Sequence, residues 1–132
     1  MEKGSYILTV KLSDKLWRKI QINKTATLDD LHEIILESYD FEDEHLYAFF
    51  MDNKAWSRGG SYYSPYYDQG PSANNVRLCD LYLSVNRNFL YLYDFGDDWR
   101  FYITVFKELT EETEKPKIID SKGKAPTQYY RS

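Results

Sequence analysis

The chain has almost no cysteine and no long hydrophobic run. Among its 132 residues the one cysteine is Cys79, so a disulfide framework within the chain is excluded. Cys79 stands between leucine-containing stretches with no base close in sequence, which is typical of a small apolar side chain rather than a nucleophile. No segment reaches the roughly 18 apolar residues of a membrane-spanning helix, and residues 1–4 lack the apolar stretch of a signal peptide. We therefore expect a cytoplasmic protein without membrane contact.

An excess of positive charge is also lacking. The formal net charge is −4, from 17 Lys and Arg against 21 Asp and Glu, and no basic run occurs. Because phosphate neutralisation supplies most of the affinity for nucleic acid, this charge balance disfavours non-specific nucleic-acid binding. It does not exclude a local basic patch. Aromatic residues, in contrast, make up 17% of the chain and include 13 Tyr. A tyrosine buries its ring and keeps its hydroxyl wet, so this content is typical of a sheet with one half-covered face.

Alternating apolar and polar residues predict the elements of the first third of the chain. Residues 6–12 and 16–22 alternate, and we expect them to form a hairpin around a turn at residues 13–15. Thr27 is a good N-cap for a helix that has an apolar stripe along one side and ends near residues 38–40.

The later segments decide the fold class. A third strand is expected at residues 45–51, whereas residues 52–75 contain several glycines and prolines and predict a long loop, with a short strand at Ala55-Trp56 as an option. The order of hairpin, helix, strand, irregular stretch and final hairpin predicts one α+β domain over residues 1–132. This order is that of the β-grasp (ubiquitin-like) fold, a mixed sheet crossed by one main helix.

The final hairpin is the clearest local signal. Its expected strands are Phe89–Phe95 and Trp99–Phe106, joined through a Gly-Asp turn at residues 96–97. This turn sets Asp94 opposite Trp99 and Leu92 opposite Phe101. The face predicted to lie in the core then holds Leu90, Leu92, Trp99, Phe101, Ile103 and Val105. The opposite face holds Tyr91, Tyr93, Arg100 and Tyr102.

The stretch Tyr93–Trp99, with the sequence Tyr-Asp-Phe-Gly-Asp-Asp-Trp, resembles a known signature. Four other stretches match in order: Tyr6–Val10 with Leu16–Ile20, Thr27–His32, His45–Phe49, and the tail Lys122–Tyr129. Together they resemble the Ri-plasmid open-reading-frame-three-like family, which is also met as a passenger protein of a bacterial insertion sequence. The resemblance implies a β-grasp-like α+β domain with no established biochemical activity, and its association with mobile elements hints at a role near DNA. The family usually continues with Glu-His, where this chain has Arg100-Phe101, and this loss of a ligand or base weakens a catalytic interpretation.

Two surfaces are candidate binding sites. The first is the outer hairpin face, where Tyr91, Tyr93, Arg100 and Tyr102 could contact a protein partner or stack single-stranded bases, unless the segment Ser61–Tyr67 covers them. The second is the acidic turn of Asp94, Asp97 and Asp98 beside Trp99, whose carboxylates could equally serve the turn itself by accepting backbone or Trp hydrogen bonds. The leading hypothesis is a non-enzymatic interaction module that binds a protein partner. The sequence does not specify its oligomeric state.

A divalent metal site is the main alternative. His32 at the flank of the helix and His45 at the start of the third strand could bind a metal together with Asp97 or Asp98, although a histidine beside a core stripe is more often a packing residue. Such a site would favour a metal-dependent enzyme acting on nucleic acid, and a nucleic-acid accessory protein is a third option. Otherwise no cofactor is expected.

One charged residue falls on a core-facing position. Arg18 lies on the inward side of its strand and needs a partner there. We expect either an ion pair with Asp94 or another carboxylate at the end of the sheet, or a β-bulge that turns Arg18 outward.

Overall fold

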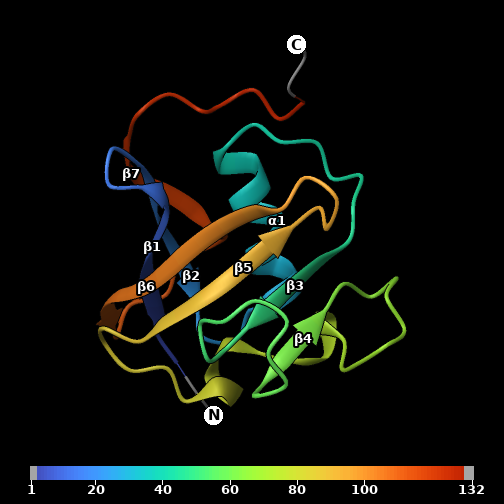
Figure 1. Ribbon diagram of the computed structural model, residues 1–132. Coiled ribbons are helices and arrows are strands. Elements are labelled where there is room, and N and C mark those ends of the chain that lie inside the picture. The colour runs from blue at the N-terminus through green and yellow to red at the C-terminus, as the bar shows by residue number, and fades with distance from the viewer. Residues whose placement is uncertain (1–2, 130–132) are drawn as a thin grey trace.

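The computed structural model describes residues 3–129, which form one antiparallel sheet with an α-helix against one of its faces (Figure 1). The strands are β1 (Ser5–Ser13), β2 (Leu16–Asn23), β3 (Tyr47–Phe50), β4 (Ser61–Tyr63), β5 (Asn88–Tyr93), β6 (Trp99–Leu109) and β7 (Lys117–Lys122). They lie in the order β4-β3-β5-β6-β1-β2-β7, and each neighbouring pair is antiparallel. The α+β class is therefore confirmed. The β-grasp assignment is not, because the sheet is open and antiparallel throughout rather than mixed.

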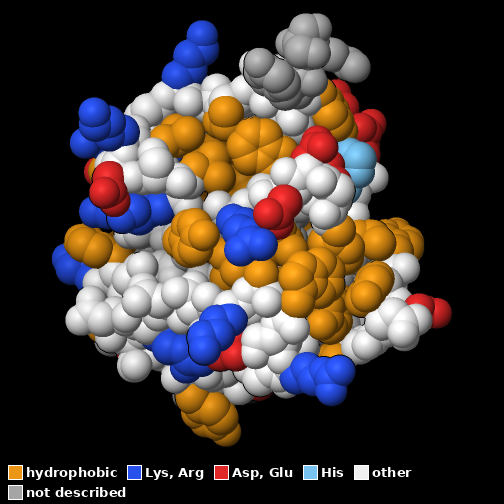
Figure 2. Space-filling view, in the orientation of Figure 1, with side chains coloured by type: hydrophobic (Ala, Val, Ile, Leu, Met, Phe, Trp, Pro, Cys, Tyr) orange, Lys and Arg blue, Asp and Glu red, His pale blue; other side chains and the backbone are white. Residues whose placement is uncertain are grey.

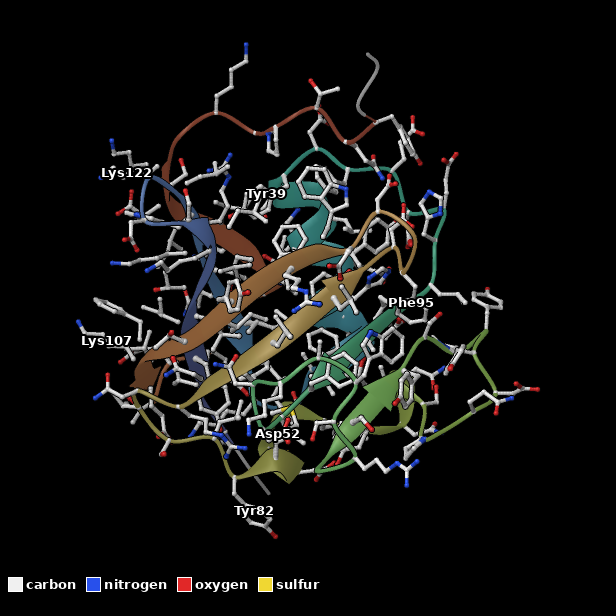
Figure 3. The ribbon with its side chains drawn as sticks, in the orientation of Figure 1. Tyr39, Asp52, Tyr82, Phe95, Lys107 and Lys122 are labelled. Carbon is white, nitrogen blue, oxygen red and sulfur yellow. The ribbon has the colours of Figure 1, made fainter. Side chains whose placement is uncertain are left out.

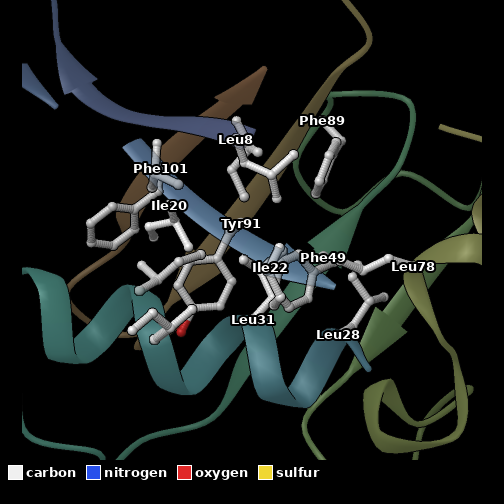
Figure 4. Packing of buried hydrophobic residues seen from close by; sticks show 14 of the residues in the cluster. Leu8, Ile20, Ile22, Leu28, Leu31, Phe49, Leu78, Phe89, Tyr91 and Phe101 are labelled. Carbon is white, nitrogen blue, oxygen red and sulfur yellow. The ribbon is translucent and has the colours of Figure 1, made fainter. Parts of the chain in front are cut away.

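Helix α1 (Leu28–Ser38) begins where the sequence predicts. The Thr27 hydroxyl accepts from the Asp30 amide at 3.0 Å, and the Asp30 carboxylate accepts from the Thr27 amide at 2.9 Å, so two otherwise unpaired amides are satisfied. The apolar side of the helix packs on the inner face of the sheet, where side chains of β1, β2, β3, β5 and β6 point toward it (Figure 4). Two short 3-10 helices, η1 (Ala73–Asn75) and η2 (Leu78–Leu81), follow β4. Within residues 3–129 no helix has the length and apolar composition needed to cross a membrane.

The register of the final hairpin differs by one residue from the expected register. Tyr93 pairs with Trp99 and Tyr91 with Phe101, so the loop contains five residues, 94–98. Because side chains alternate across a strand, this slip reverses the faces of β5. Tyr91 and Tyr93 are fully buried on the helix side, whereas Leu90 and Leu92 lie on the outer side. The expected faces were therefore wrong for all four of these β5 residues and right for the core residues of β6.

Asp94 causes the longer loop. Its backbone is left-handed, with φ of 64°, and its Oδ1 accepts from the amides of Gly96 at 3.1 Å and Asp97 at 3.2 Å. The amide of Asp98 also donates to the carbonyl oxygen of Asp94, at 2.6 Å. These bonds remove Asp94 from the strand and confirm that it serves the turn. The Trp99 indole N–H, in contrast, has no hydrogen-bond partner within residues 3–129, so it does not donate to Asp94.

A second apolar cluster covers the outer face of β3 and β5. Its buried members are Ala48, Phe50, Leu90 and Leu92, and its partly buried members are Ala55, Tyr63 and Phe95. Trp56 and Tyr67 pack their rings on Phe95, with centroid distances of 4.7 and 5.6 Å. The segment expected to be a long loop therefore does cover the outer face, but over leucines rather than tyrosines. It also contains β4 in place of a strand at Ala55-Trp56.

Arg18 points inward as expected but does not pair with Asp94. Its Nε donates to the carbonyl oxygen of Ser38 at 2.8 Å, and its Nη1 donates to the carbonyls of Trp17, Lys122 and Gly123 at 2.9–3.1 Å. The guanidinium also lies 4.7 Å from the ring centroid of Tyr39. Ser38 ends α1, so its carbonyl lacks a helical partner and carries the negative end of the helix dipole. The expected carboxylate partner and the outward bulge were therefore both wrong, because Arg18 stays buried and donates to backbone carbonyls instead.

Candidate functional site

A cavity of about 600 Å³ opens between α1 and the segment leading into β3. Five parts of the chain line it: α1, the connection after the helix, the first residue of β3, the segment after β4, and η1. The lining residues are Asp29, His32, Glu33, Asp43, Glu44, His45, Leu46, Tyr47, Ser64, Pro65, Tyr66 and Asn74. On the surface this region is visible as a histidine beside Asp and Glu side chains at the right-hand edge of the molecule (Figure 2). The site therefore joins segments that are far apart in the sequence.

His32 forms the floor of the cavity. Its ring is 3% exposed and stacks on the ring of Tyr47 at 3.8 Å between centroids. Nε2 lies 3.0 Å from the Asp43 carboxylate and Nδ1 lies 2.5 Å from the Tyr91 hydroxyl. A carboxylate accepts, so in the neutral ring Nε2 carries the hydrogen and the Tyr91 hydroxyl donates to Nδ1. Burial lowers the pKa of His32, while Asp43 opposes this shift, and the ring is held neutral with both nitrogens bonded.

Three tyrosine hydroxyls anchor the wall behind His32. Tyr47 donates to the Asp29 carboxylate, and Tyr93 donates to the carbonyl oxygen of Glu42 at 2.5 Å while accepting from the Glu44 amide at 2.8 Å. Burial raises the pKa of Tyr47, Tyr91 and Tyr93, and nearby carboxylates add to the shift. For Tyr93 the amides of Glu44 and His45 oppose the shift, but its pKa is still raised. The hydroxyls therefore stay protonated and act as hydrogen-bond donors rather than bases.

His45 stands at the rim, with its side chain 34% exposed. Its Nε2 lies 2.9 Å from the Tyr129 hydroxyl and 3.5 Å from the Asp94 carboxylate. The Tyr129 hydroxyl in turn donates to the Glu44 carboxylate at 2.7 Å. These contacts connect the hairpin turn and the C-terminal tail to the cavity.

The cavity carries an unbalanced negative charge. Four carboxylates line it, those of Asp29, Glu33, Asp43 and Glu44, and among residues 3–129 no Lys or Arg lines it. Burial raises the pKa of Glu33, and the charges of neighbouring aspartates, Asp29 and Asp43 among them, raise it further. Since like charges disfavour one another's ionised state, a positive group placed in the cavity would be stabilised.

The predicted metal site is not assembled. His32 and His45 do line the same cavity, but Asp97 and Asp98 are not among its lining residues. In the part of the chain that the structure describes, no group of three or more His, Cys, Asp or Glu side chains could hold a metal ion. Both ring nitrogens of His32 are also engaged by protein partners.

The predicted outer binding face is divided by the register of the hairpin. Tyr91 and Tyr93 belong to the network behind the cavity, whereas Arg100 and Tyr102 remain on the outer side. Arg100 donates to the Asp98 carboxylate at 3.1 Å.

The remaining cavity residues were not singled out from the sequence. Asp43 and Glu44 belong to the acidic connection after the helix. Their position directly before the candidate His45 was the sequence feature that could have identified them. Tyr129 gave no local signal, since it reaches His45 from the other end of the chain.

Comparison with known proteins places the chain among proteins without an assigned activity. A family model described as plasmid pRiA4b ORF-3-like protein matches residues 5–129. Uncharacterized protein y4hQ of Sinorhizobium fredii is similar at 28% identity over 114 residues, which cover 83% of this chain and 56% of that protein. The crystal structure of MM3350, a protein of unknown function from Methanosarcina mazei Go1, is similar with a TM-score of 0.78 and 30% identity, over 97% of this chain and 74% of that one. The chain thus spans little more than half the length of the curated relative.

Proposed function

This chain belongs to the plasmid pRiA4b ORF-3-like family, and we propose that it is a non-enzymatic binding module whose cavity receives a cationic group from a protein partner. The group is an amine or a guanidinium, as carried by lysine and arginine side chains. The observation that carries this proposal is the set of four carboxylates around the cavity, with no Lys or Arg among the lining residues in the described range 3–129. A cation bound there would relieve the mutual repulsion that, together with the larger effect of burial, raises the pKa of Glu33.

The shape and walls of the cavity support a side chain as the ligand. A volume of about 600 Å³ lies within the range of ordinary ligand pockets and accommodates one long basic side chain. Tyr66 stands among the lining residues with 91% of its surface exposed, so its ring is free to cover the aliphatic stem or to make a cation–π contact. Large exposed aromatic rings are also typical of protein interfaces.

The hydrogen bonds of the cavity support binding over acid–base catalysis. A general base needs a free lone pair directed at its substrate, but both nitrogens of His32 are occupied and its ring is buried. The tyrosines beside it have raised pKa values and cannot serve as bases near neutral pH. Asp43 and Glu44, in contrast, each retain carboxylate lone pairs for a donor from a ligand.

A thermal-shift titration tests the proposal. The cationic probes are Nα-acetyl-lysine amide and Nα-acetyl-arginine amide, whose side chains stay charged. The neutral control is Nα-acetyl-norleucine amide. A cationic probe at about 100 times its Kd should raise the free energy of unfolding by about 2.7 kcal/mol, and the neutral probe should raise it far less. Zinc and manganese serve as further probes, and a larger stabilisation by either metal than by the amides would favour the metal-dependent alternative.

Matched variants locate the binding. Asp43→Asn and Glu44→Gln should each weaken the cationic probe about tenfold, because each removes a charge-assisted hydrogen bond of about 1.4 kcal/mol. Glu112→Gln changes the same charge at an exposed position outside the cavity and should leave the affinity unchanged. Equal responses to the charged and neutral probes would contradict the proposal.

A further inference from the structure

The outer face of the sheet carries exposed and half-buried side chains on β6, β1, β2 and β7. Side chains at alternate positions of these strands point away from α1, and the cover formed by the second apolar cluster lies over β3 and β5 instead. The register places Tyr102, Lys11, Trp17 and Lys122 in one row across the four strands. The next row contains Thr104, Thr9, Lys19 and Asp120. We call these two rows, with Arg100, Phe106 and Lys107, the outer face.

Basic side chains predominate on the outer face. It carries Lys11, Lys19, Arg100, Lys107 and Lys122, against the carboxylates of Asp14, Asp98 and Asp120 at and beside it. Lys11 pairs with Asp14 at 2.8 Å and Arg100 with Asp98 at 3.1 Å. Figure 2 shows the Lys and Arg side chains with hydrophobic ones between them on the left-hand side, where Figure 3 labels Lys107 and Lys122. Although the whole chain has a net charge of −4, this surface is therefore positive.

Aromatic rings stand between the basic side chains. Tyr102 and Phe106 are 44% and 46% exposed, and Trp17 is half-buried two strands away. The Lys19 ammonium lies 3.7 Å from the ring centroid of Phe106 and 5.4 Å from that of Trp17. Tyr102 and Phe106 are four residues apart on one strand, a separation of roughly 13 Å. Each ring can therefore take a separate planar group, at Phe106 on the ring face away from Lys19.

We propose that the outer face binds single-stranded nucleic acid. Exposed rings on a sheet provide stacking platforms for bases, and interleaved lysines bind the phosphates between them. A duplex keeps its bases stacked inside and offers no free base to these rings, and an acidic protein surface offers carboxylates to the lysines but no series of bases to stack on the rings. The residues differ from the face predicted from the sequence, because the hairpin register removes Tyr91 and Tyr93 and leaves Arg100 and Tyr102 beside β1 and β2.

Fluorescence anisotropy with labelled oligonucleotides of about 12 nucleotides tests the proposal, since site sizes on such platforms are of this order. Single-stranded DNA or RNA should bind at about 20 mM salt, and the logarithm of the association constant should fall with a slope of about −2 against log salt if three lysines neutralise phosphates. Stacking on Trp17 should also quench tryptophan emission. Absence of binding by both single strands would overturn the proposal.

Two variants and one control place the binding on the outer face. The double variant Tyr102→Ala/Phe106→Ala and the single variant Lys19→Glu should each weaken single-strand binding at least tenfold, with folding checked by circular dichroism. Tyr66→Ala removes an even more exposed ring, which belongs to the cavity, and should not change single-strand binding. Failure of this inference and failure of the cationic-ligand proposal are therefore separable. Equal or tighter binding of a duplex, polyglutamate or anionic vesicles would overturn the single-strand assignment.

Discussion

The buried Tyr91–His32 hydrogen bond allows the register of the hairpin to be tested by removing a single hydroxyl group. In Tyr91→Phe the aromatic ring remains and only the hydroxyl is lost. The Nδ1 atom of His32 then has no partner in a position where the ring is 3% exposed and the tyrosine is fully buried. Leaving a buried acceptor unpaired costs about 1–3 kcal/mol, so the free energy of unfolding should fall by that amount.

Urea denaturation at neutral pH measures this change, read as a shift of the midpoint at unchanged m. Tyr102→Phe is the matched control, because that hydroxyl lies on the outer face and its loss should change stability by less than about 0.5 kcal/mol. A double-mutant cycle with His32→Leu should give a coupling energy of about 0.5–3 kcal/mol. If both tyrosine variants are neutral, Tyr91 faces solvent and the register is refuted.

Three further predictions concern charged residues. Burial lowers the pKa of His32 in the native state, so below about pH 6.5 the unfolded chain binds a proton that the native chain does not. The contribution of neutral His32 to the free energy of unfolding should therefore be fully present above that pH and fall by up to about 1.4 kcal/mol per pH unit below it. His32→Gln should lack this slope in denaturation curves between about pH 5 and 7, and an identical slope in both proteins would refute the assignment. Arg18→Met should cost about 2–4 kcal/mol, since it leaves the Ser38 carbonyl unpaired, whereas the exposed Arg58→Met should be nearly neutral. Asp94→Asn keeps the Oδ1 acceptor of the turn and should change stability by less than about 1 kcal/mol. A loss of about 3 kcal/mol would instead indicate a buried Arg18–Asp94 ion pair, which the structure replaces with carbonyl partners for Arg18.

Local chemistry made much of the fold predictable. The N-cap at Thr27, the N-terminal hairpin and the α+β class depend on short-range patterns, and the structure confirms them. The edge strand β7 was not predicted, because its side chains are all exposed and it therefore lacks the alternation that marks a half-buried strand. Whether the sheet is mixed or antiparallel depends on which distant strands pair, and no local pattern specifies this.

The site was less predictable, for a reason that lies in one residue. Asp94 adds one residue to the hairpin loop by bonding to the amides that follow it, and this shift moves Tyr91 and Tyr93 from the predicted surface into the interior. His32 and His45 were identified as candidates, and they do lie in one cavity. Their actual partners, Asp43 and Tyr129, come from the connection after the helix and from the tail, so only the folded chain brings them together.

An NMR titration with acetyl-arginine amide tests the central claim, that the acidic cavity binds a cationic group. Saturable chemical-shift changes should appear at the backbone amides of Asp43, Glu44 and Tyr66. The amides of β2 and β7, at the opposite edge of the sheet from β3 and β4, should stay unchanged. The same titration of Asp43→Asn should saturate at about tenfold higher concentration. Shifts that are absent, or spread evenly over the surface without saturation, would contradict the claim.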